Sequence, residues 1–113
     1  MHIGNLDGSA SSSGTTWSAT VEITVLDGNN VRLNGATVVG KWSVPGLNAN
    51  TCTTGDLGGN GTCVVLFPSL KKSTKSVTFT VTSVTMSGFT YVPSSNTDPD
   101  GSSNGTKVVI KRP

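Results

Sequence analysis

The chain has 113 residues, of which 34% are hydrophobic and only 12% charged, and its formal net charge at pH 7 is +2. This length supports one domain with a single core. The small net charge, without Lys and Arg interleaved with aromatic residues, argues against a nucleic-acid partner. No apolar run approaches the roughly 18 residues of a membrane span, so we expect no membrane insertion.

The first part of the chain contains its clearest strand. Residues 2–8, HIGNLDG, are predicted to form a short edge strand, and residues 9–16 a flexible polar connection. In residues 16–27 apolar and polar side chains then alternate with a period of two, from Trp17 to Val25. This period and the many β-branched residues predict a β-strand and argue against a helix.

The middle of the chain continues with turns and strands. Residues 27–30, DGNN, are turn residues that tolerate positive φ, and residues 36–44 form the next predicted strand. Gly40 inside that strand indicates a bulge or a close approach of another segment. Residues 70–75, LKKSTK, are the only cluster of basic residues, which we interpret as a solvated loop between strands.

Two cysteines, Cys52 and Cys63, flank a glycine-rich turn. Neither belongs to a CxxC motif, and the lone histidine, His2, adds little to a zinc site. We therefore predict a local disulfide that ties two short strands together. Such a bond implies an oxidising, extracellular location.

The last third of the chain holds a second long strand, residues 75–86. Val77, Phe79 and Val81 share one parity whereas Val84 and Met86 take the other, so we predict a bulge near residues 82–83. Residues 88–92 either continue this strand or start a short one, and residues 106–112 form the closing strand.

These patterns predict an all-β fold. About seven short strands separated by turns indicate an immunoglobulin-like antiparallel β-sandwich with Greek-key connections, formed as one domain by residues 1–113. A β-barrel is the main alternative. We expect no enzymatic activity, because His2 is the only histidine and the carboxylates form no pair suited to glycoside hydrolysis.

The loop NTDPDGSSNGT, residues 96–106, is a candidate calcium site. Side-chain oxygens occupy alternate positions, namely Asn96, Asp98, Asp100, Ser102 and Asn104, which approximates the opening of a calcium-binding loop. The twelfth position is Lys107, where a bidentate Glu would normally stand, so we expect Asp7 to supply a further carboxylate. The alternative is a plain turn stiffened by side-chain bonds to the backbone.

The aromatic residues allow a second hypothesis. Trp17, Trp42 and Phe79 follow the inward alternation of their strands and are predicted to pack in the core. Phe89 and Tyr91 are less determined by their pattern, and they could form part of a carbohydrate-binding surface.

The segments LNGATVVGKWS, CTTGDLGGNGTC and VTFTVTSVT resemble parts of bacterial immunoglobulin-like and carboxypeptidase-regulatory-like modules. With HIGNLDGS and NTDPDGSSNGT as its most specific parts, nearly the whole chain resembles an accessory domain found near the C-terminus of secreted bacterial proteases and other hydrolases. Ser102 stands where that domain more commonly has an acidic residue. The resemblance implies a β-sandwich without catalysis of its own.

We therefore expect a non-catalytic spacer, stabiliser or adhesion module, cut from a larger secreted or cell-surface protein. Its expected partner is a neighbouring catalytic or surface domain of the same chain, and we expect a monomer. The alternative function is a module that binds polysaccharide or cell-wall material. Calcium is the only expected cofactor.

Overall fold

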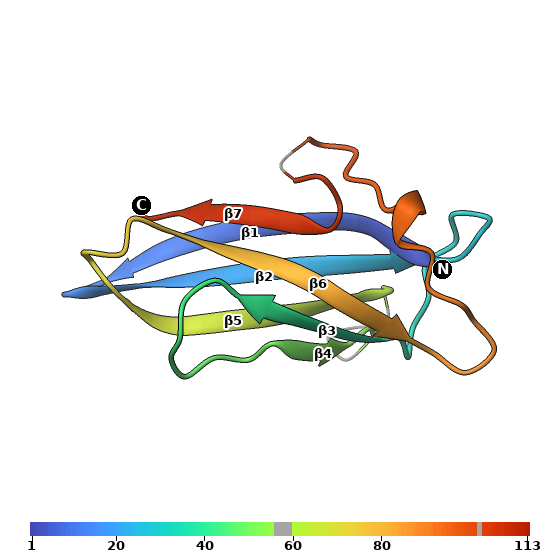
Figure 1. Cartoon of the computed structure of the whole chain (residues 1–113), viewed down its shortest axis with the longest axis horizontal. Coiled ribbons are helices and arrows are strands. Elements are labelled where there is room, and N and C mark those ends of the chain that lie inside the picture. Colours follow the sequence, from blue (N-terminus) through green and yellow to red (C-terminus); the bar gives the residue numbers. More distant parts are fainter. Residues whose placement is uncertain (56–59, 102) are drawn as a thin grey trace.

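The computed structural model describes residues 1–55, 60–101 and 103–113. The described residues form two antiparallel sheets that pack face to face (Figure 1). One sheet has the order β1-β2-β5 and the other the order β4-β3-β6-β7. The strands are β1 (His2–Ser13), β2 (Thr16–Leu26), β3 (Thr37–Trp42), β4 (Thr51–Thr53), β5 (Thr62–Lys71), β6 (Ser76–Thr85) and β7 (Lys107–Lys111).

This arrangement is the predicted immunoglobulin-like sandwich with Greek-key connections. The chain passes between the sheets after β2, after β4 and after β5, so neighbours in space are often distant in sequence. A 3₁₀ turn, η1 (Pro93–Ser95), interrupts the long connection between β6 and β7. None of the helices in the described residues is long and apolar enough to cross a membrane.

Inward-facing side chains of both sheets form one core. Trp17 and Phe79 are its largest fully buried residues, and Trp42 packs against Phe79 with ring centroids 5.0 Å apart. The alternation that predicted β2 is therefore the alternation that fills the core. The predicted core positions of Trp17, Trp42 and Phe79 are confirmed.

One bulge between β3 and β6 agrees with two predictions from the sequence, the parity change near residues 82–83 and the role of Gly40. Val39 of β3 pairs with Ser83 of β6, whereas Gly40 pairs with Val81, so Thr82 is an extra residue that changes the parity of β6. A Cβ atom added at Gly40 would lie 2.2 Å from Phe79 Cζ. Glycine is therefore needed where β3 approaches the core.

Three boundaries differ from the predictions. Residues 9–13 are not a flexible connection but the second half of β1, where Ser9 pairs with Thr20 and Ser13 with Thr16. Backbone pairing with β2 orders this serine-rich segment although it has no hydrophobic alternation. Strand β5 runs on to Lys71, and residues 88–92 form no strand, only a bridge between Met86 and Phe89.

The disulfide joins Cys52 of β4 to Cys63 of β5, with Cα atoms 5.8 Å apart, and so ties one sheet to the other. Beside it, Ala49 pairs with Leu66 of β5. The predicted bond is confirmed. In the chain-entropy model, closing a loop of this length stabilises the fold by about 3 kcal/mol.

Candidate metal centre and the adjoining groove

Three carboxylates from distant parts of the chain meet beside strand β1. One oxygen each of Asp7, Asp98 and Asp100 lies within 4.8 Å of the others. Asp7 belongs to β1, whereas Asp98 and Asp100 belong to the loop between η1 and β7. The structure thus brings Asp7 to the loop carboxylates, as the sequence predicted.

Backbone contacts explain why the loop reaches β1. The N–H of Thr97 donates to the carbonyl of Ile3 at 2.9 Å, and the N–H of Ile3 donates to Asn96 Oδ1 at 2.8 Å. Both hydrogen bonds of Ile3 therefore tie the start of the loop to β1. Gly105, with φ +83°, lies so close to Thr97 that an added Cβ would be 2.7 Å from its nitrogen.

Hydrogen bonds within the loop close the turn that carries Asp100 and position the Asp98 carboxylate. The N–H of Gly101 donates to the carbonyl of Asp98 at 3.1 Å, which closes a turn around Asp100. Ser103 Oγ donates to Asp98 Oδ2 at 2.5 Å. The loop is thus folded around its own acidic residues. Ser102, discussed above for its departure from the acidic pattern, lies outside the described residues, as do residues 56–59 of the glycine-rich turn.

The donor set fits calcium, which takes six to eight oxygen ligands. Asn5 Nδ2 donates to Asp7 Oδ2 at 2.9 Å, which places the Asn5 amide beside the cluster. Asn5 Oδ1 is buried and accepts no hydrogen bond within the described part of the chain. Rotating this amide would turn its oxygen toward a cation. Sequence reasoning missed Asn5, although its spacing by two from Asp7 places both on one face of β1.

The two predicted amide ligands have another use in the structure. Asn96 Oδ1 accepts from Ile3, while its Nδ2 donates to the Tyr91 hydroxyl at 2.7 Å and to Thr106 Oγ1 at 2.9 Å. Asn104 Oδ1 accepts from the N–H groups of Thr106 and Lys107 at 2.9 and 2.8 Å, just before β7. Both amide oxygens thus accept hydrogen bonds from backbone N–H groups and hold the ends of the loop.

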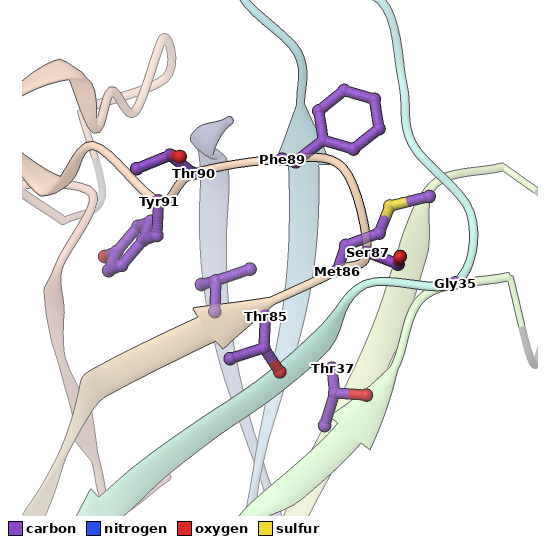
Figure 2. A pocket seen from close by; sticks show the side chains of 9 residues that line it. Gly35, Thr37, Thr85, Met86, Ser87, Phe89, Thr90 and Tyr91 are labelled. Atoms are coloured by element: carbon purple, nitrogen blue, oxygen red, sulfur yellow. The ribbon is translucent and has the colours of Figure 1, made fainter.

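Phe89 and Tyr91 lie at a groove of about 600 Å³ near the end of β6 (Figure 2). Its walls include Thr37, Thr85 and Met86. Phe89 is 41% exposed, whereas Tyr91 is half-buried against the core. Figure 2 shows the two rings pointing to different sides of the segment that carries them, so they do not form one flat platform.

Comparisons of the chain with models of known families, with curated proteins and with solved structures each return no match. The fold and the site together define a class of protein. It is a disulfide-bonded immunoglobulin-like sandwich with an acidic cluster between its first strand and its last loop.

Proposed function

We propose that this chain is a non-catalytic accessory module of a secreted or cell-surface multidomain bacterial protein, and that calcium stabilises it. The disulfide favours an oxidising, extracellular location. The single histidine, His2, is buried at the start of β1, which gives no support to a base-assisted mechanism.

The shape suits a spacer. The molecule measures 44 × 24 × 22 Å, and its two termini lie toward opposite ends of the long axis (Figure 1). Domains attached to the two ends would be held apart by the length of the sandwich. The neighbouring domain of the same chain is thus the proposed partner.

The observation that carries the calcium proposal is the convergence of Asp7, Asp98 and Asp100. Three carboxylates within this distance repel one another, and a divalent cation would replace that repulsion by attraction. With Asn5 as a further oxygen donor, the ion would join β1 to the loop before β7. Calcium would act here on stability and not on chemistry.

Calcium is expected to raise the melting temperature of the wild-type protein relative to chelator. A concentration one hundred times the dissociation constant contributes about 2.7 kcal/mol, or about 10 °C or more for a domain of this size. Asp100→Asn should abolish this increase. In chelator, however, the variant should melt at the same temperature as wild type or slightly higher, because one repelling charge is gone. Differential scanning calorimetry with and without calcium measures both effects.

Asp27→Asn is the matched control, since Asp27 accepts hydrogen bonds from Asn29 and Val31 in a turn outside the cluster. It should keep the full calcium-dependent increase. Identical wild-type melting curves in calcium and chelator would refute the proposal. Asp100 would then be part of a turn only.

A second candidate function is a carbohydrate-binding module, which the exposed ring of Phe89 at the groove favours. Phe89→Ala is then expected to abolish retention on insoluble cell-wall polysaccharide in a pull-down, because a stacking ring contributes through its exposed face. Leu47→Ala, which truncates an 87% exposed side chain elsewhere, should change nothing. Equal retention of Phe89→Ala and wild type would rule out this groove.

A further inference from the structure

Five of the eight Lys and Arg residues gather at the end of the molecule where the C-terminus lies (Figure 1). Strand pairing places Lys111 opposite Ser76, and the backbone N–H of Arg112 donates to the carbonyl of Lys75 at 2.9 Å. The Arg112 guanidinium also donates to the carbonyl of Lys72. We call this exposed group the cationic tip: Lys71, Lys72, Lys75, Lys111 and Arg112.

Hydrogen bonds stabilise the backbone of the turn at residues 71–74 in the cationic tip. Trp17 is fully buried, and its indole Nε1 donates to the carbonyls of Lys71 at 3.2 Å and of Thr74 at 3.0 Å. The N–H of Thr74 closes the turn by donating to Lys71 at 2.9 Å. A ligand of this turn would therefore not have to order its backbone, which lowers the entropic cost of binding.

Acidic residues lie elsewhere in the described parts of the chain. Asp7, Asp98 and Asp100 form the cluster, Glu22 pairs with Asp7 on the adjacent strand, and Asp27 follows the opposite end of β2. The contacts of Lys72 and Arg112 are with neutral oxygens, those of Ser12 and of the Lys72 carbonyl. Although the net charge of the chain is small, positive charge is concentrated at this end of the molecule, and its electric field would attract polyanions.

The chemistry around the cationic tip favours a sugar polymer over nucleic acid or membrane. Ser73 and Thr74 lie in the same turn as Lys72, and Ser12 of β1 contacts Lys72 through its hydroxyl group, so these hydroxyls can bond sugar hydroxyls. Trp17 and Phe67, which lie beside the turn of residues 71–74, are both buried and offer no face on which bases could stack. Leu47 is exposed on the loop after β3, and a single leucine is a weak membrane anchor.

We propose that the cationic tip binds a linear anionic polysaccharide, through repeating carboxylate or sulfate groups. The five cations would displace counterions condensed on the polyanion, so affinity should fall steeply with salt. This site is separate from the calcium cluster and from the Phe89 groove. It gives the module an attachment function that does not depend on the proposed metal.

The test uses two triple variants that change the net charge equally. Lys72→Gln, Lys75→Gln and Lys111→Gln alter the cationic tip, whereas Arg32→Gln, Lys41→Gln and Lys107→Gln alter cations elsewhere. Binding to polygalacturonate and to dextran sulfate is measured by isothermal titration calorimetry in chelator, with neutral dextran as a blank. The tip variant should lose at least tenfold in affinity and show a weaker salt dependence, and the control variant should lose less than threefold.

Several outcomes would overturn the proposal. Equal losses in both variants would show a general effect of net charge, and absence of wild-type binding to either polymer would refute it directly. Binding confined to duplex DNA would identify a phosphate-backbone partner instead. Binding confined to anionic vesicles, and lost in Leu47→Ser, would identify a membrane surface. Preference for one of the two polymers would tell whether carboxylate or sulfate groups are recognised.

Discussion

Replacing Trp17 by alanine is expected to lower the free energy of unfolding by about 3–5 kcal/mol, the range for truncating a buried large aromatic side chain. Trp17 is fully buried on β2, the central strand of its sheet. The change also removes the donor for the carbonyls of Lys71 and Thr74. Because domains of this size are stable by about 5–15 kcal/mol, much of the total stability would be lost. Urea unfolding followed by circular dichroism measures the effect.

Trp17→Phe separates packing from hydrogen bonding. Phenylalanine keeps much of the apolar ring but has no N–H group, so we expect a loss of about 1–2 kcal/mol. If the indole orders the cationic tip, Trp17→Phe should also weaken binding to anionic polysaccharide. Leu47→Ala, at an 87% exposed position, is the control and should stay within about 0.5 kcal/mol of wild type. A cost below about 1 kcal/mol for Trp17→Ala would contradict the described core.

The strands that have alternating side chains could be predicted from sequence because alternation and burial have the same cause. Strand β2 and the parity change at Thr82 were both visible in this way. The second half of β1 was not, because Ser9–Ser13 carry no pattern of burial and are ordered by backbone pairing with β2. A register between two strands is a property of the pair and leaves little trace in a polar segment.

The acidic cluster was partly predictable, since Asp98 and Asp100 are close in sequence and Asp7 belongs to a predicted first strand that could lie beside their loop. The uses of Asn5 and Asn96 were not predictable, because their partners are set by the edge of β1 and by the loop path. The cationic tip could not be predicted from sequence either, because its residues come together only through strand pairing. The pairing of β6 with β7 brings Lys111 and Arg112 beside Lys75, at the end of residues 70–75. In the sequence, residues 70–75 are an isolated cluster of basic residues.

Asn96→Ala is expected to lower the free energy of unfolding by about 3 kcal/mol, because one side chain joins three segments. It accepts from the buried Ile3 N–H and donates to Tyr91 and Thr106. A buried donor left without a partner costs about 1–3 kcal/mol, and two further hydrogen bonds are lost. Tyr91→Phe, which removes one of these bonds, should cost only about 1 kcal/mol. Both are measured by urea unfolding in chelator, so that calcium does not contribute.

Asn29→Ala is the matched control, because Asn29 is exposed in the turn after β2 and should cost less than about 0.5 kcal/mol. Asn96→Ala also tests whether Asn96 positions the proposed metal ligands. Asn96 fixes the start of the segment that carries Asp98 and Asp100, so Asn96→Ala should reduce the calcium-dependent rise in melting temperature as well as the baseline stability. If the baseline falls but the full calcium increment remains, Asn96 stabilises the fold without positioning the carboxylates. The acidic loop would then reach β1 through the Thr97 backbone contact and its own internal bonds.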